Sequence, residues 1–138
     1  MAELKLSDIS KKMRKMDICM MSTAASNGTI TSRPMSNNGD VEYDGNSYFY
    51  SYEEAEVIKE LKENDNLNLS FQGDDEFYIA ISGESKLITD KKILKEHWVP
   101  SLNEWFKDGV FTPGIILIHV KAKSIKYWHN EEQGEVKF

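Results

Sequence analysis

Cysteine is nearly absent from the sequence: Cys19 is the single one, so no disulfide can form within the chain. This composition is typical of a reducing compartment, and we expect a cytoplasmic protein. No histidine or basic residue adjoins Cys19 in the sequence to activate its thiol. We therefore expect this cysteine to be buried and unreactive.

Long hydrophobic runs and positive charge are also scarce. No stretch approaches the ~20 apolar residues that a membrane-spanning helix needs, and the amino terminus lacks the hydrophobic segment of a signal peptide. Seventeen lysines and arginines face 23 acidic residues, a net charge of −6. Nucleic-acid binding requires clustered cations. We expect neither a membrane nor a nucleic acid as partner, but a small molecule or another protein.

Motifs for catalysis by the chain's own side chains are missing. The histidines His97, His119 and His129 have no metal-ligand spacing with one another or with Cys19. The sequence contains no Gly-x-Ser-x-Gly, no P-loop and no Gly-x-Gly-x-x-Gly. We expect no metal site and no catalytic residue. An enzyme with so few reactive side chains leaves its chemistry to a cofactor.

What the sequence does contain is a series of short strand patterns within one predicted domain, residues 1–138. Alternating apolar and polar residues predict strands over residues 17–25, 29–36, 40–43, 47–51, 67–71, 76–88 and 114–127. Helical spacing predicts helices over residues 7–16, 52–64 and 90–106. Turn signals favour hairpins at Asn27-Gly28 and Asp44-Gly45, with a bend at Asn38-Gly39. The predicted fold is mainly β (α+β), a small antiparallel barrel of about six strands with short flanking helices.

Several single positions refine this prediction. Ser51 and Ser101 each precede a glutamate by three residues, a pattern that predicts a capped helix start at both places. Gly83 predicts a bulge or a close backbone approach within its strand. The last strand changes its apolar phase, which predicts a bulge near Lys123 or Ser124.

Arg33-Pro34 is the most distinctive pair in the strand patterns. The chain has only one other arginine, Arg14, which lies in a lysine-rich helical segment. Pro34 cannot donate to a sheet ladder, so its strand is predicted to lie at a sheet edge or to break its pairing there. Backbone groups freed at this point can face a ligand. A solvated arginine beside an edge-strand proline explains the same pattern without a ligand.

Several motifs in order carry a family resemblance. Thr31–Ser36, Tyr48–Ser51 before a helix, and Leu67–Phe71 resemble the pyridoxamine 5'-phosphate oxidase-like split-barrel flavoproteins. Later segments are similar to the general stress protein subgroup: His97-Trp98, Leu102–Phe106, Asp108-Gly109, Thr112–Gly114 and Tyr127-Trp128. The resemblance runs from about Ser7 to Val136. It implies a homodimeric six-stranded split β-barrel with flavin mononucleotide (FMN) in each of two clefts at the subunit interface.

The resemblance also implies which residues contact the cofactor. They are Arg33, Pro34, Met35, Ser36, Tyr50, Ser51, Tyr52 and Trp105. Arg33 would lie near the phosphate or ribityl chain, the backbone from Pro34 to Ser36 along the flavin ring edge, and Tyr50 to Tyr52 beside the phosphate. Trp105 would reach the cofactor from the partner subunit. The residues alone allow a simpler interpretation, with Tyr50 and Trp105 as core aromatics and Ser51 as a helix cap.

One departure from the family pattern concerns the phosphate. Family members place an Arg-Lys pair at the start of the second helix, and this chain has Glu56 and Val57 at those positions, with Glu53 and Glu54 close by. At an effective dielectric constant of ~20, each carboxylate about 6 Å from a phosphate charge costs on the order of 3 kcal/mol before screening. FMN affinity is therefore expected to fall about ten- to hundredfold.

Two functions follow from these patterns. The first is an FMN-binding protein of the general-stress type, a low-activity oxidoreductase that transfers hydride between flavin and a small substrate or nicotinamide. The alternative is a non-catalytic dimeric module that has lost tight flavin binding and holds another ligand or a protein. Authentic pyridoxamine phosphate oxidase activity is not expected, because the sequence ends at Gly134–Phe138 without the basic substrate-contacting segment of those oxidases.

Overall fold

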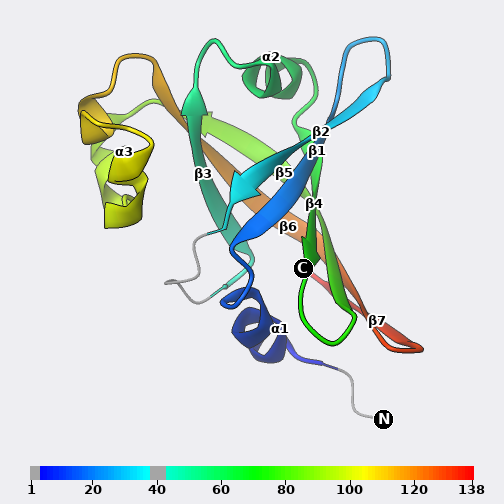
Figure 1. Ribbon diagram of the computed structural model, residues 1–138. Coiled ribbons are helices and arrows are strands. Elements are labelled where there is room, and N and C mark those ends of the chain that lie inside the picture. Colours follow the sequence, from blue (N-terminus) through cyan, green and yellow to red (C-terminus); the bar gives the residue numbers. More distant parts are fainter. Residues whose placement is uncertain (1–3, 38–42) are drawn as a thin grey trace.

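The computed structural model describes residues 4–37 and 43–138 (Figure 1). One antiparallel sheet runs in the order β2-β1-β4-β5-β6-β3, with β7 paired to β6. The strands are β1 (Ile18–Ala24), β2 (Ile30–Ser36), β3 (Asn46–Tyr52), β4 (Asn66–Gln72), β5 (Phe77–Ile88), β6 (Ile115–His129) and β7 (Glu132–Lys137). The helices are α1 (Leu6–Met13), α2 (Glu56–Glu63) and α3 (Lys91–Glu96), with short 3₁₀ turns η1 (Pro100–Glu104) and η2 (Gly109–Phe111). The predicted mainly antiparallel β fold with short helices is confirmed.

The helices cover the ends and one side of the curved sheet (Figure 1). α1 and α2 lie at opposite ends, and α3 lies beside β3. Most of the buried apolar side chains form one core inside the sheet, among them Met21, Leu69 and Ile118. A smaller cluster on the outer side of β6 contains Leu94 and Phe106, and it holds the segment from α3 to η2 in place.

The strand predictions were accurate with two exceptions. The predicted strand 40–43 and the bend at Asn38-Gly39 fall outside the described residues, apart from Tyr43. β7 was not predicted, because Glu132–Lys137 is polar and mostly exposed. Its pairing depends on a turn at Asn130, whose φ is 60°, a left-handed value that asparagine tolerates better than most residues. The seventh strand is thus specified by a turn and not by an apolar pattern.

Both predicted helix caps were wrong. Ser51 still belongs to β3, where it pairs with Ile116 of β6, and α2 begins only at Glu56 after Ala55. Ser101 lies inside η1, which begins at Pro100. Strand pairing with β6 therefore overrides the local capping signal at Ser51.

The irregularities predicted at Gly83 and near Lys123 or Ser124 belong to the same bulge, between β5 and β6. Ser82 pairs with Ser124 and Gly83 pairs with Ala122, so Lys123 is the extra residue on β6. The backbones also approach closely here, since a Cβ atom on Gly83 would lie 2.6 Å from the Lys121 carbonyl oxygen.

Cys19 is buried in the core, and this burial raises the pKa of its thiol to about 12, as expected of an unreactive cysteine.

Candidate functional site

A pocket of about 470 Å³ lies between β2, β3 and the segment that contains η1. Sixteen residues line it: Ile18, Pro34, Met35, Ser36, Asn37, Tyr48, Phe49, Tyr50, Ser51, Tyr52, His97, Val99, Ser101, Leu102, Trp105 and Phe106. We call this the aromatic pocket. Seven of the eight residues that the family resemblance implies are among them, and Arg33 is not.

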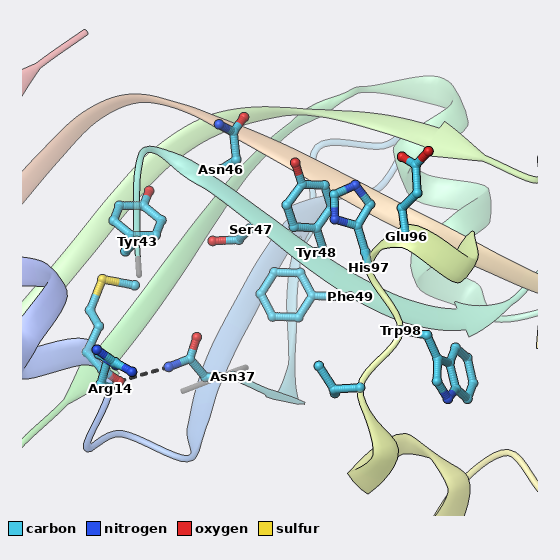
Figure 2. Close-up of a pocket in the computed structure, with 12 residues that line it drawn as sticks. Arg14, Asn37, Tyr43, Asn46, Ser47, Tyr48, Phe49, Glu96, His97 and Trp98 are labelled. Carbon is cyan, nitrogen blue, oxygen red and sulfur yellow. Dashed lines mark hydrogen bonds between the residues drawn. The ribbon is translucent and has the colours of Figure 1, made fainter. Parts of the chain in front are cut away.

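A second pocket of about 350 Å³ adjoins the aromatic pocket and shares part of its lining. Figure 2 shows Tyr48 and His97 against each other in this second pocket, with Asn37 and Arg14 on the far side. The ring centroids of Tyr48 and His97 are 3.7 Å apart, with an angle of 14° between the planes. His97 thus joins the loop after α3 to β3, a contact that nothing in the sequence spacing indicated.

The other face of Tyr48 stacks on His119 of β6, with a centroid separation of 4.7 Å. Burial lowers the pKa of His119, and the charges of Lys121, His97 and Lys86 lower it further. Its Nε2 atom lies 2.8 Å from Asn46 Oδ1. A neutral imidazole is therefore favoured beside the tyrosine ring.

Tyr50 links β3, which forms one wall of the aromatic pocket, to α3, which precedes the other wall in the chain. Its hydroxyl donates a 2.6 Å hydrogen bond to the carbonyl oxygen of Leu94 in α3. Its ring meets Trp98 edge-on, with centroids 4.9 Å apart. Burial raises the pKa of Tyr50 to about 12, so the hydroxyl remains a donor at neutral pH. Tyr50 therefore packs against other aromatic residues and also lines the pocket, so the interpretation as a packing aromatic and the expectation of a pocket residue both apply to it.

Trp105 lies at the end of η1, and 70% of its surface is exposed. The interpretation of Trp105 as a core aromatic is therefore wrong. In the single chain it lines the same pocket as Tyr50 and Tyr52. An indole in this position offers an apolar face to a ligand.

The Arg33 side chain does not line this pocket and instead lies against Thr23, Thr31 and helix α2. Its guanidinium donates to Thr23 Oγ1 and Thr31 Oγ1, both at 2.7 Å, and to the Met21 carbonyl oxygen at 3.2 Å. Its Nη2 atom also forms a 3.1 Å ion pair with Glu60 Oε2 of α2. All of these contacts are with other residues of the same chain.

Glu60 is the residue that sequence reasoning missed. It is almost fully buried and accepts hydrogen bonds from Thr31 at 2.8 Å and Thr23 at 3.0 Å. The hydrogen bond from Thr31 is the main cause that lowers the pKa of Glu60, and Thr23 and Arg33 add to it. A signal was present, since Glu60 lies three residues after Val57 on the apolar face of α2. A carboxylate at such a position needs a partner.

The start of α2 bears on phosphate binding. Glu53, Glu54 and Glu56 are exposed, whereas Val57 is buried in the core. No lysine or arginine occurs among the sixteen residues that line the aromatic pocket. The described lining residues of the pocket therefore supply apolar and aromatic surface but no lysine or arginine for a phosphate.

Within residues 4–37 and 43–138, no helix is long and apolar enough to cross a membrane. The same residues bring together no group of three histidine, cysteine, aspartate or glutamate side chains that could hold a metal ion.

Comparisons with known proteins agree with this geometry. The chain is 27% identical to the protein bli-3 of Neurospora crassa over 136 positions, which cover 89% of this chain and 64% of that protein, so the chain spans less than two thirds of this relative. The fold matches a Clostridium acetobutylicum protein related to general stress protein 26, with a TM-score of 0.84, 17% identity and coverage of 96% and 94% of the two chains. It also matches the general stress FMN/FAD binding protein of Xanthomonas citri, with a TM-score of 0.77, 20% identity and coverage of 92% and 89%. Both likenesses show the split-barrel fold.

The family model described as pyridoxamine 5'-phosphate oxidase like matches residues 5–138, almost the whole chain. With the fold and the pocket as described, this match shows that the chain belongs to the pyridoxamine 5'-phosphate oxidase-like family.

Proposed function

We propose that the aromatic pocket binds a flavin, namely FMN as in the family, and that the protein is a low-activity oxidoreductase. The observation that carries this proposal is the convergence of seven of the eight implied residues on one pocket. A structural neighbour from Xanthomonas citri is described as an FMN/FAD binding protein, which supports the same ligand class. The pocket volume of about 470 Å³ lies within the usual range of ligand sites.

The bound flavin would supply hydride transfer with a small substrate or nicotinamide. The chain's own residues would bind and orient the ring. Tyr52 and Trp105 offer aromatic faces, and the backbone from Pro34 to Ser36 offers polar groups along one edge. The bond from the Tyr50 hydroxyl to Leu94 would hold the two pocket walls at a fixed separation.

We also propose that the protein acts as a homodimer. Ile18 and Met20 of β1 and Ile30 of β2 are large apolar side chains with 40 to 65% of their surface exposed. Ile18 and Pro34 belong both to this outward face and to the pocket lining. A second copy that covers the face would also close one side of the pocket.

The alternative is a dimeric module without catalysis that has lost tight flavin binding. It is favoured by one observation, the lack of a cation among the described lining residues of the pocket. Under this alternative, the pocket would hold an uncharged apolar ligand or a segment of another protein.

The deciding experiment is a visible absorption spectrum of the purified protein, followed by titration with FMN. Binding should shift the flavin absorption bands and quench tryptophan fluorescence, and anaerobic addition of a reduced nicotinamide should bleach the bound flavin slowly. The Trp105→Ala variant should bind about five- to hundredfold more weakly, since a stacked aromatic contact contributes about 1–3 kcal/mol.

Phe111→Ala is the matched control, because Phe111 is 67% exposed but does not line the pocket. Its flavin affinity should equal that of the unaltered protein. Failure of every flavin to bind would favour the non-catalytic alternative. Binding without reduction would retain the flavin site and remove the oxidoreductase assignment.

A further inference from the structure

We infer that the aromatic pocket selects a flavin by its ring and gains nothing from its phosphate, so that riboflavin binds at least as tightly as FMN. This inference rests on the proposed function, because it assumes that a flavin ring occupies the pocket. It names a ligand class for the site: an uncharged heteroaromatic ring with a polar, unphosphorylated side chain.

The lining of the pocket is the first argument. Its side chains include no aspartate, glutamate, lysine or arginine, and His97 is the one histidine among them. Besides His97, its polar side chains are neutral hydroxyls and one amide: Ser36, Asn37, Tyr48, Tyr50, Ser51, Tyr52 and Ser101. Hydroxyl and amide groups of this kind match the hydroxyls of a ribityl chain and the polar edge of a flavin ring. They do not compensate the charge of a phosphate, which is about −2.

The engagement of Arg33 is the second argument. Arg33 adjoins the lining residue Pro34 and is the nearest guanidinium along the chain. Its two terminal nitrogens donate to four acceptors inside the fold, including the carboxylate of Glu60. A ligand phosphate could recruit Arg33 only by leaving Glu60 as a buried charge without a cation, which is unfavourable.

The surrounding charge is the third argument. Three exposed glutamates, Glu53, Glu54 and Glu56, follow the lining residue Tyr52 along the chain. The exposed Lys107 follows the lining residue Phe106, but the exposed Glu104 and Asp108 lie close to it in the chain. The neighbouring pocket is lined by one cation, Arg14, but also by Glu96. Residues 38–42, which follow the lining residue Asn37 along the chain, contain no lysine or arginine. With a net charge of −6, the protein as a whole repels a phosphate.

The test is a titration of the full chain with lumiflavin, riboflavin and FMN at about 0.05 M and about 0.5 M salt, where surface charges are screened weakly and strongly. Riboflavin should bind as tightly as FMN or up to about tenfold more tightly at low salt. Salt should leave riboflavin affinity unchanged and should tighten FMN binding, because screening reduces repulsion. Inorganic phosphate should not compete with riboflavin.

The outcomes separate this inference from the proposed function. FMN binding that is about tenfold tighter than riboflavin binding and weakens with salt would overturn the inference and leave the flavin site in place. No binding of any of the three flavins would remove the proposed function, and the inference with it.

A pair of variants tests the stated cause. Ser101 is exposed on η1 at the pocket, so Ser101→Lys adds a cation there, and Ser101→Gln adds a neutral side chain of similar reach. The lysine variant should bind FMN about five- to tenfold more tightly than the glutamine variant, whereas the two variants should bind riboflavin equally. If the two variants bind FMN with equal affinity, the missing cation is not the reason that the pocket gains nothing from the phosphate.

Discussion

Arg33 Nη2 lies 3.1 Å from Glu60 Oε2 and so joins edge strand β2 to helix α2. The arginine is 21% exposed and the carboxylate 6%. Thr23 and Thr31 complete the hydrogen bonding of both side chains. In this chain, the residue expected from the family resemblance to contact a ligand therefore forms an ion pair and hydrogen bonds within the fold.

The first prediction concerns the contribution of this ion pair to stability. Arg33→Met should lower the free energy of unfolding by about 2–4 kcal/mol, because it leaves Glu60 as a buried charge without a cation. Urea unfolding measures the effect. The double variant Arg33→Met with Glu60→Gln should recover part of the loss, since no uncompensated charge remains. If the loss in the double variant equals the sum of the losses in Arg33→Met and Glu60→Gln measured singly, the two side chains are not coupled.

The second prediction concerns the pH dependence of stability. The pKa of Glu60 is lower in the folded protein than its ordinary value of 4.5. The stabilisation is therefore complete above about pH 5 and is lost as the pH falls through the folded pKa. Unfolding curves between about pH 7 and about pH 3 should show a smaller loss of stability for Glu60→Gln than for the unaltered protein. Parallel pH profiles would contradict the ionised, hydrogen-bonded state of Glu60.

The third prediction concerns the tie between the pocket walls. Tyr50→Phe removes the donor to the Leu94 carbonyl oxygen and should lower stability by about 1–2 kcal/mol. Flavin affinity should fall as well, because α3 loses its hydrogen bond to β3. Tyr52→Phe is the matched control, since Tyr52 lines the same pocket but is largely exposed. Its unfolding midpoint should remain within experimental error of the unaltered protein.

The fourth prediction concerns the helix start at which family members hold a phosphate. Glu56→Arg removes one exposed carboxylate and adds a guanidinium, so FMN binding should tighten by about 1–3 kcal/mol. Riboflavin should gain almost nothing, and the FMN gain should shrink as salt rises. Equal gains for both ligands would place the phosphate away from α2. Val57→Lys is unsuitable for this test, because Val57 is buried in the core.

The fifth prediction concerns assembly. Sedimentation should give a mass near twice 15.9 kDa. Met20→Glu places a charge on the outward face of β1 without altering a lining residue of the pocket, and it should shift the protein towards monomer. Flavin affinity should fall in parallel if the second copy closes the pocket. A monomer at micromolar concentration in the unaltered protein would contradict the dimer and its role in the site.

The sequence predicted the strands well because their pattern has a period of two and is set by burial on one face. The Gly83–Lys123 bulge was also foreseeable, as a glycine on one strand and a phase change on the other. Ser51 was misread because a cap motif is local, whereas the pairing of Ser51 with Ile116 joins residues far apart in the chain. β7 was missed because its side chains bury little surface.

For the site, the resemblance indicated the pocket but not the direction of one side chain. Pro34 and Arg33 are neighbours in sequence, and the alternation of β2 places them on opposite faces. The partner of Arg33 is 27 residues away in α2, a separation with no periodic signal. Long-range polar pairs of this kind become visible only once the barrel and its helices are placed.

One wall of the aromatic pocket comes from one continuous stretch, residues 97–106, which packs on β3 and β6 through the smaller hydrophobic cluster. The barrel core lies on the other side of β3 and β6 and forms a separate cluster. Substitutions at the exposed lining residues of this stretch can therefore change the surface of the pocket while the barrel core keeps its packing.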